Sequence, residues 1–264
     1  MEGKRILRVQ TRRKDLRFPF PENFNHRIEG ARLKHMGRRA KYLVAELSSG
    51  EALIMHLGMT GRFTVSGKKP GKFHHEAGEA EKHDHVVFDM QGGATVTFND
   101  ARRFGFMDLW PLADLDRYPP FDGMGPEPIS NQFSGAYLQE AFAGKKAPVK
   151  AALLDQYVVA GLGNIYVCEA LFRSGISPKK LAGAIKRDKL EILAVEIRKV
   201  IEEAIEAGGS TISDFETTTG ELGYFQHRFQ VYDREGDPCI TCAKPVKRLV
   251  QSGRSTFYCG TCQK

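Results

Sequence analysis

The chain has 264 residues, of which 41% are hydrophobic and 27% charged, and its formal net charge is +7. This composition is typical of a globular protein of about two domains, and it excludes a low-complexity or disordered chain. No run of ~18 apolar residues occurs, so the sequence predicts no membrane-spanning helix. Basic residues near the start lack a following apolar segment, so we expect no signal peptide and a cytoplasmic protein.

The excess of positive charge is concentrated in residues 4–41, where only Asp15, Glu22 and Glu29 oppose many lysines and arginines. Such a stripe suits a polyanion such as DNA, because neutralising phosphates releases counterions. A solvated face or an anionic membrane surface would explain the same charge. The stripe alone therefore does not decide the partner.

Short strands are predicted from residue 5 to residue 110, because apolar or alternating runs are separated by turn residues. The predicted strands are 42–47, 52–57, 61–65, 85–90, 94–98 and 105–110. Several short strands with close turns favour a β-sandwich or barrel. Residues 66–82 form a polar insertion that we expect to be a loop.

Two turns between these strands are candidates for contact with nucleic acid. Residues 100–105 place Arg102 and Arg103 beside Phe104. Arginine pairs with base edges or phosphate, and an aromatic ring can enter a base step. The alternative is a charged turn with Phe104 in the core. The second turn, at residues 56–61, has Met59 near its tip, where a methionine is more often part of a core.

Four histidines lie in the polar insertion or just after it: His74, His75, His83 and His85. They could hold a second metal ion. Solvated or phosphate-facing histidines are the favoured interpretation.

Residues 111–131 are rich in proline and glycine and predict a linker, after which the apolar period becomes helical. Helices are predicted at 133–142, 149–157, 164–173 and 190–207, with Gly175 as a C-terminal cap of the third. In the last helix, one apolar face is predicted to contain Leu190, Leu193, Ile197, Val200, Ile201, Ala204 and Ile205. Cys168, alone on the third helix, is expected to be a buried apolar residue.

Gly161-Leu162-Gly163 precedes the third predicted helix, where exposed amides and the positive helix end suit a phosphate. Tyr166 stands where a dinucleotide-binding fingerprint needs glycine, so that motif is excluded. A plain corner between two helices is the alternative.

Two Cys-x-x-Cys pairs, Cys239 with Cys242 and Cys259 with Cys262, are separated by residues 243–258. This spacing is typical of a four-thiolate zinc site. Two disulfides are the alternative, but such pairs in reducing compartments are usually metal or redox sites. A closed site of four sulfurs has no open coordination position, so we expect one structural Zn²⁺ holding a hairpin that presents basic side chains, above all Arg254.

Seven stretches in this order resemble the bacterial formamidopyrimidine-DNA glycosylase family: 37–43, 56–59, 82–85, 100–105, 125–128, 161–166 and the zinc hairpin ending at 254–259. The resemblance implies an α+β multidomain fold with DNA in the cleft between domains. Its parts would be an N-terminal β-sandwich (1–112), a linker (113–130), a helix–two-turn–helix domain (131–228) and a zinc finger (229–264).

The resemblance also implies roles for site residues. Met59, Arg102 and Phe104 would fill the gap left by a base flipped out of the duplex, which is needed because the glycosidic carbon is unreachable inside the stack. Contacts with the surrounding phosphates would come from Lys41, His83, Lys145, Asn164 and Arg254. Lys41 and Arg254 would also donate protons in β- and δ-elimination, and residues 217–225 would cover a flipped 8-oxoguanine.

The implied function is base-excision repair by a bifunctional glycosylase and AP lyase that removes oxidised purines through a Schiff base. The expected partner is double-stranded DNA with oxidised bases or abasic sites, bound by a monomer in the nucleoid of a bacterial cytoplasm, without a membrane. An endonuclease VIII-type enzyme for oxidised pyrimidines is the alternative. The His-Leu-Gly-Met run at 56–59 and the loop at 217–225 favour the purine enzyme.

One departure from the family concerns its nucleophile. The family's mature chain begins Pro-Glu-Leu-Pro-Glu; its N-terminal proline amine attacks the sugar and the adjacent glutamate is the acid. This sequence begins Met1-Glu2-Gly3 and aligns after that segment, so we expect this catalytic pair to be absent. A start codon set downstream, a shortened version of the protein, or a non-catalytic protein that binds damaged or intact duplexes would each explain the departure.

Overall fold

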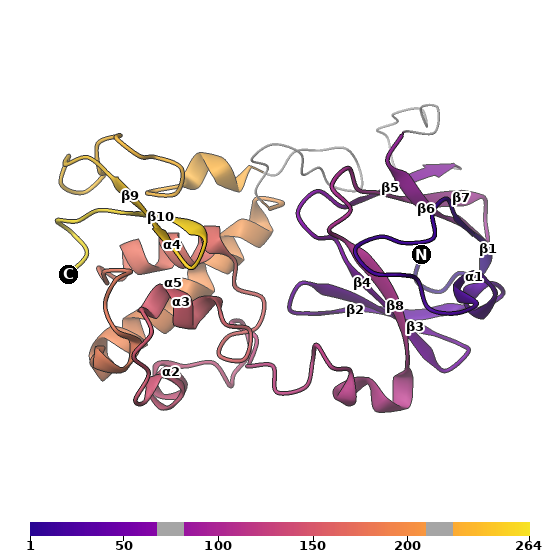
Figure 1. Cartoon of the computed structure of the whole chain (residues 1–264), viewed down its shortest axis with the longest axis horizontal. Coiled ribbons are helices and arrows are strands. Elements are labelled where there is room, and N and C mark those ends of the chain that lie inside the picture. The colour runs from indigo at the N-terminus through magenta and orange to yellow at the C-terminus, as the bar shows by residue number, and fades with distance from the viewer. Residues whose placement is uncertain (68–81, 210–223) are drawn as a thin grey trace. The chain divides into compact units, whose positions relative to one another are not determined.

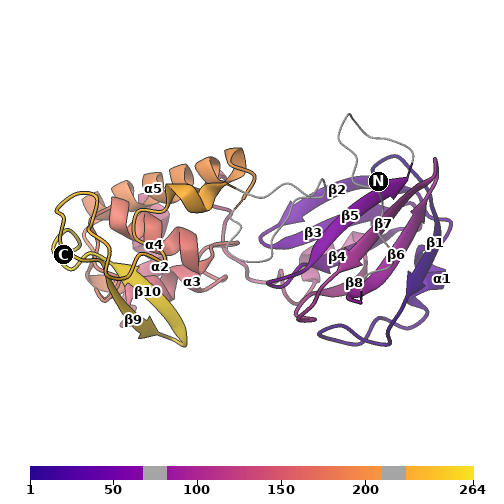
Figure 2. The ribbon, with the colours of Figure 1, turned by 90° about the horizontal axis from the view of Figure 1, so that it is seen from above.

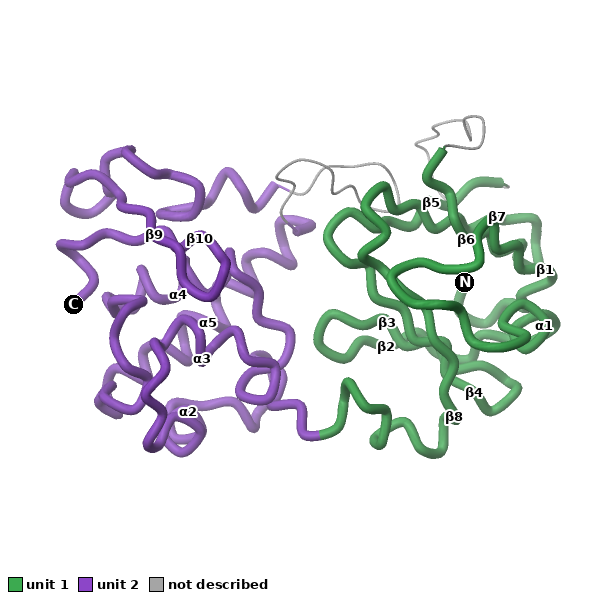
Figure 3. The backbone as a smooth tube through the Cα atoms, in the orientation of Figure 1, with its two compact units in different colours: residues 1–122, 210–223 green, residues 123–209, 224–264 purple. Residues whose placement is uncertain are grey.

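A computed structural model describes residues 1–67, 82–209 and 224–264, which form two compact units (Figures 1 and 3). Unit 1 contains residues up to 122, and unit 2 contains 123–209 and 224–264. His74, His75, most of the predicted insertion at 66–82 and most of the predicted covering loop at 217–225 lie outside the described residues.

Unit 1 is a sandwich of two antiparallel four-stranded sheets (Figure 2). The first sheet has the order β1 (Ile6–Thr11), β6 (Asp84–Met90), β7 (Ala94–Asn99), β5 (Arg62–Gly67). The second has the order β2 (Leu33–Arg39), β3 (Tyr42–Leu47), β4 (Glu51–His56), β8 (Phe106–Pro111). Apolar side chains from both sheets, including Phe88, Phe98, Leu53 and Met107, share one core. The predicted β-sandwich is confirmed.

Two strands and one short helix were not predicted. Strand β1 buries Ile6 and Val9, which are three residues apart, because a register irregularity between Ile6 and Arg8 interrupts the usual alternation of buried and exposed residues. Strand β2 buries only Leu33 fully, and its charged sequence shows no alternation of apolar and polar residues from which a strand could be predicted. Both strands lie at a sheet edge, where pairing depends on the neighbouring strand more than on local pattern. Helix α1 (Phe24–Ile28) is too short to show helical periodicity.

The first part of the predicted linker belongs to unit 1. A 3₁₀ helix, η1 (Leu112–Arg117), leads to Tyr118, which is buried against Val44 and Ile54 on the outer face of the second sheet. The Tyr118 hydroxyl donates to Asp108 at 3.0 Å. The second sheet is therefore covered on both faces.

The helices of unit 2 are α2 (Gly135–Phe142), α3 (Val149–Leu154), α4 (Asn164–Arg173) and α5 (Arg187–Glu206). Helix α5 packs against α2 and α4, and α3 packs against α4. The four predicted helices are confirmed, with two corrections. Helix α3 ends at Leu154, because Asp155 turns the chain by accepting from Tyr157 N at 3.0 Å. Ile205 is 63% exposed, so it does not belong to the buried face of α5.

A short 3₁₀ helix, η2 (Ala182–Ala184), precedes α5. Another, η3 (Phe225–Arg228), lies near the start of the last described range, 224–264. Gly175 has φ +65°, the left-handed conformation of a residue that ends a helix, as predicted.

The C-terminal hairpin consists of β9 (Lys247–Gln251) and β10 (Arg254–Tyr258). It packs on α4 through a small core that contains Cys168, Phe172, Val231, Val246 and Phe257. The Cys168 thiol is buried there, as predicted, and the burial raises its pKa. Hairpin and helices thus form one compact unit.

Across the described ranges, no helix is both long and apolar enough to cross a bilayer.

Candidate nucleic-acid interface and metal centre

The turn at residues 100–105 is organised by a buried carboxylate. Asp100 is 0% exposed, and its Oδ2 accepts from the backbone N–H of Gly105 at 2.8 Å. Its Oδ1 accepts from the Thr60 hydroxyl and from Arg102 N, the latter at 3.3 Å. Since Thr60 belongs to the other candidate turn, one side chain joins the turns at 57–61 and 100–105.

Glycine allows these two turns to approach each other closely. Gly58 has φ +67°, and a Cβ added there would lie 2.6 Å from Gly105 N and 2.9 Å from Phe104 Cβ. No side chain fits in that space, so any substitution of Gly58 would separate the turns.

The side chains at the tips of both turns point outward. Met59 is 67% exposed and Phe104 is 42% exposed, so neither is a core residue. The Arg102 guanidinium lies over the Phe104 ring, 4.6 Å from its centroid. A hollow next to this turn is lined by Asp15, Leu16, Arg17, Arg102, Arg103 and Phe104. The structure therefore presents an apolar wedge surrounded by guanidinium groups.

His56 stabilises the turn at residues 57–61 through a hydrogen bond and a ring contact. Its Nδ1 accepts from Gly58 N at 2.9 Å, and its ring stacks on Phe106 at 5.5 Å. Burial, followed by the charges of Lys41 and Arg17, lowers the pKa of His56. The neutral ring that results can keep its acceptor for Gly58. Lys41 is exposed between β2 and β3, near enough to His56 to act on its charge.

The two described histidines of the 74–85 group differ in environment. His85 is buried, and its Nε2 lies 2.8 Å from the Asp100 carbonyl oxygen. The expectation of a solvated or phosphate-facing His85 is therefore wrong, because the ring fills the space beneath the 100–105 turn. His83 is half-buried, and its carbonyl accepts from Asp100 N at 3.0 Å.

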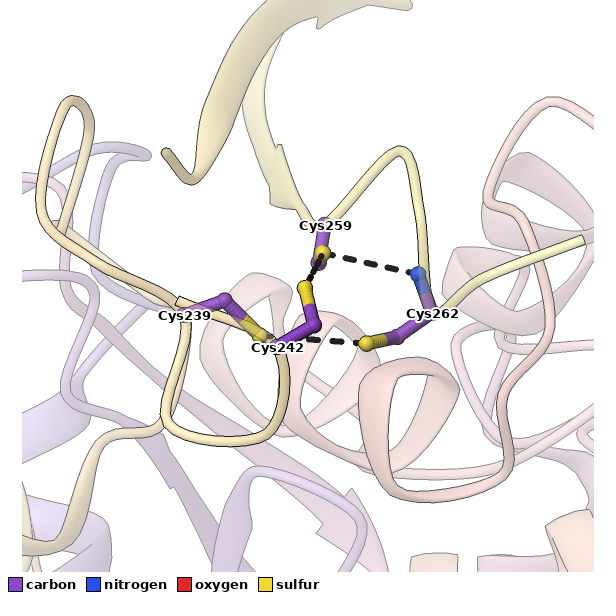
Figure 4. A group of neighbouring side chains, drawn as sticks. All are labelled: Cys239, Cys242, Cys259 and Cys262. Carbon is purple, nitrogen blue, oxygen red and sulfur yellow. Dashed lines mark hydrogen bonds between the residues drawn. The ribbon is translucent and has the colours of Figure 1, made fainter. Parts of the chain in front are cut away.

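The four cysteines converge as a metal site requires (Figure 4). All four Sγ atoms lie within 4.8 Å of one another; Cys239 and Cys262 are 3.9 Å apart, and Cys242 and Cys259 are 3.5 Å apart. A tetrahedron with Zn–S bonds of ~2.3 Å has edges of about 3.8 Å, so these residues fit one zinc ion. The backbone N–H of Cys262 points to Cys259 Sγ at 3.5 Å and favours the thiolate form.

The hairpin closes through Ser252 and Gly253, which both have positive φ, as the tightest hairpin turns require. Arg254 follows at once and is exposed. The next residue, Ser255, is bound to the helices: its carbonyl accepts from Asn164 Nδ2 and Lys150 Nζ, each at 2.9 Å. The structure thus brings Asn164, at the start of α4, next to the residue that follows Arg254.

Lys145 is half-buried on the loop after α2, and its carbonyl accepts from Gly183 N at 3.1 Å. The expected phosphate-contacting residues are thus divided between the units. Lys41 and His83 belong to unit 1, and Lys145, Asn164 and Arg254 belong to unit 2.

Two buried charged residues of unit 2 were not predicted to matter. Glu169 is 0% exposed and accepts from the backbone N–H groups of Gln230, Val231 and Tyr232 at 2.9–3.0 Å. Lys150 is equally buried, and burial lowers its pKa. Each is the one charged residue in an apolar helical run, 167–172 and 149–154 respectively, and that is a signal that could have revealed them.

Three family models match successive parts of the chain. The formamidopyrimidine-DNA glycosylase N-terminal domain matches residues 1–107, and the formamidopyrimidine-DNA glycosylase H2TH domain matches 124–216. The zinc finger found in FPG and IleRS matches 236–264. A sandwich followed by such a helical domain and a four-cysteine finger defines a class of DNA-repair proteins, in agreement with the geometry above. The chain belongs to the formamidopyrimidine-DNA glycosylase family.

Relatives support this assignment over the full length. A formamidopyrimidine-DNA glycosylase of Dinoroseobacter shibae is 55% identical over 267 residues, covering 100% of this chain and 94% of the relative. One from Ruegeria sp. (strain TM1040) is 54% identical with the same coverage. The crystal structure of the MutM (Fpg) protein from Thermus thermophilus has a TM-score of 0.86 and 36% identity, covering 100% of this chain and 92% of that chain.

Proposed function

We propose that these 264 residues, when the family's N-terminal proline segment precedes them, remove oxidised purines such as 8-oxoguanine and then cleave the strand as an AP lyase, as a DNA-formamidopyrimidine glycosylase of base-excision repair. The observation that supports this most is the exposed group of Met59, Arg102 and Phe104 above the buried carboxylate of Asp100. A base must leave the stack before its glycosidic bond can be reached. An apolar wedge with an adjacent guanidinium suits the gap that the base leaves.

Each side chain of this group has a proposed part. Phe104 enters the base step and unstacks it, Met59 fills the vacated space, and Arg102 donates to the partner base. The Arg102 guanidinium lies 4.6 Å from the centroid of the Phe104 ring, so the two side chains stand next to each other at the tip of the turn.

Basic and polar residues of both units are proposed to contact phosphates around the lesion: Lys41, His83, Lys145, Asn164 and Arg254. Lys41 and Arg254 are the proposed proton donors in β- and δ-elimination. Zinc, when bound to the four cysteines, holds the hairpin that carries Arg254 and takes no part in the chemistry.

Two similar structures support the proposed partner. One is a complex of Lactococcus lactis Fpg with DNA containing an abasic site, with a TM-score of 0.88 and 28% identity. The other is a complex of a mutant of that protein with DNA containing Fapy-dG, with a TM-score of 0.87 and 28% identity. We propose that this chain likewise binds damaged double-stranded DNA, as a monomer in the nucleoid of a bacterial cytoplasm.

The nucleophile is proposed to be the amine of the family's N-terminal proline, with the adjacent glutamate as acid. Two proteins are compared in the test. One is the 264-residue chain, and the other is the same chain preceded by a family segment that begins Pro-Glu-Leu-Pro-Glu. Each is incubated with an 8-oxoguanine:C duplex in the presence of borohydride, which traps a Schiff base.

We expect the chain with the proline to cleave the duplex and form a trapped adduct, and the 264-residue chain to bind without an adduct. Cleavage of oxidised-pyrimidine duplexes alone would instead identify an endonuclease VIII-type enzyme. Binding by both proteins with no adduct would identify a non-catalytic DNA-binding protein.

Phe104→Ala, made in the chain that carries the proline segment, tests the proposed insertion of Phe104 into the base step. We expect base excision to slow by about tenfold or more, since unstacking a step costs a few kcal/mol. Cleavage at a preformed abasic site should change little, because no base has to be removed there. Val65→Ala, at another exposed apolar residue of unit 1, is the control. Equal losses on both substrates would rule out a wedge.

A further inference from the structure

Lys150 is a fully buried lysine to which the proposed chemistry gives no part. It is the second residue of α3 and is 0% exposed. Its Nζ donates to the Ser255 carbonyl at 2.9 Å and to Thr256 Oγ1 at 2.7 Å, more than 100 residues further along the chain. An ammonium group without solvent contact cannot itself bind a DNA phosphate in this conformation, so any effect on DNA must pass through the hairpin.

The hydrogen bonds of Lys150 reach both strands beside the hairpin tip. Thr256 Oγ1, which accepts from Lys150, donates to Gln251 Oε1 at 3.0 Å. Gln251 in turn donates from Nε2 to the Pro178 carbonyl at 3.2 Å. Gln251 pairs with Arg254 across the turn. Lys150 Nζ is therefore linked by hydrogen bonds to both neighbours of Arg254: directly to Ser255, and through Thr256 to Gln251.

The residues of the tip itself are open to solvent. Ser252, Gly253 and Arg254 are all exposed. The zinc ligands nearest to the tip on β10 begin at Cys259, beyond the end of the strand. Zinc therefore orders the base of the hairpin, and contacts with the helices must order its tip.

We propose that Lys150 is a positioning residue for Arg254: it fixes the hairpin tip against α3, so that the Arg254 guanidinium meets a DNA phosphate at a defined place. The inference rests on the proposed phosphate contact of Arg254.

Lys150→Met separates positioning from folding. Methionine fills the volume of the lysine stem but donates no hydrogen bond. The Ser255 carbonyl keeps Asn164 as a donor, and the Thr256 hydroxyl keeps Gln251 as an acceptor, so no buried polar group of the hairpin loses every partner. We expect full zinc content and an intact hairpin. Lys189→Met, at an exposed lysine of α5, is the control for loss of one positive charge.

The test is a double-mutant cycle between Lys150 and Arg254, read as affinity for a duplex containing an abasic-site analogue over a range of salt concentrations. Arg254→Ala should lower the affinity and reduce the salt slope by about 1. Lys150→Met should lower the affinity by about threefold to tenfold and reduce the salt slope, although Lys150 touches no phosphate. In the Arg254→Ala background, Lys150→Met should have no further effect, because its only route is through Arg254.

Several results would overturn the inference. One is a Lys150→Met variant with unchanged affinity beside a weakened Arg254→Ala variant. Another is a double variant whose loss of DNA affinity equals the product of the losses in Lys150→Met and Arg254→Ala, since the two residues would then act independently. If Lys150→Met loses zinc, Lys150→Gln takes its place, since glutamine can still donate to Ser255; loss of zinc there too would make the role structural. An Arg254→Ala variant with full affinity would instead contradict the proposed phosphate contact.

Discussion

Asp100 is the residue on which the shape of the proposed wedge depends. Its buried carboxylate accepts from Thr60, Arg102 and Gly105. Asp100→Ala would leave buried donors without partners, at a cost of ~1–3 kcal/mol for each donor left unpaired. We expect the free energy of unfolding of unit 1 to fall by at least about 2 kcal/mol, measured by urea denaturation, together with weaker DNA binding.

Asp116→Ala is the matched control, because this aspartate is exposed. Its effect on stability should stay within ~0.5 kcal/mol. An Asp100→Ala variant as stable as this control would show that the carboxylate does not organise the turns.

His56 gives the stability of unit 1 a predictable pH dependence. Burial, Lys41 and Arg17 lower its pKa from the ordinary value of 6.5, so the folded state binds fewer protons than the unfolded state. The stabilisation is complete above that ordinary value and is lost as the pH falls below it toward the lowered pKa. His56→Asn keeps an acceptor for Gly58 but cannot titrate. We therefore expect the free energy of unfolding to fall less steeply between about pH 7 and pH 5 in this variant than in the parent.

Parallel pH profiles for the parent and His56→Asn would contradict the assigned cause.

The hairpin of β9 and β10 is the element whose order depends on a metal. Cys259→Ala leaves three thiolates, and structural zinc contributes ~10–16 kcal/mol of binding free energy in comparable peptides. We expect this variant to lose zinc, its ordered hairpin and most of its DNA affinity. Zinc is measured with a metallochromic dye, and the hairpin by hydrogen exchange of residues 247–258.

Cys168→Ala is the matched control for Cys259→Ala. Cys168 lies in the same small core as the ligands but is not one of the four clustered cysteines. It should keep a full equivalent of zinc. Retention of zinc by Cys259→Ala, or its loss from Cys168→Ala, would contradict the assigned ligand set.

The whole molecule is expected to unfold in two steps. Each unit has its own apolar core, one centred on Phe88 and Phe98 and the other on Phe133 and Leu171. Calorimetry should therefore resolve two transitions, since domains with separate cores do not have to unfold in a single cooperative step. Chelation of zinc should lower the temperature of only the transition that belongs to unit 2, and Asp100→Ala that of unit 1. A single transition that responds to both changes would contradict independent units.

The sequence by itself determined the elements whose cause is local. Helix α4 was predicted with its bounds because Gly163 precedes it and Gly175 ends it, and strand β3 because its apolar run is bounded by turns. The zinc ligands followed from spacing alone, since a two-residue gap turns both sulfurs to one point. Strands β1 and β2 could not be predicted in the same way, because their pairing depends on partners far along the chain.

Only the tertiary structure decided which side chains are exposed. Phe104 could have been a core residue by its pattern, but Asp100 and Gly58 hold its turn so that the ring stays outside. His85 and Lys150 looked like ordinary polar residues, but segments 15 and 105 residues away cover them and accept their hydrogen bonds. Burial is a property of what packs on a residue, and neither periodicity nor spacing records which distant segment will do so.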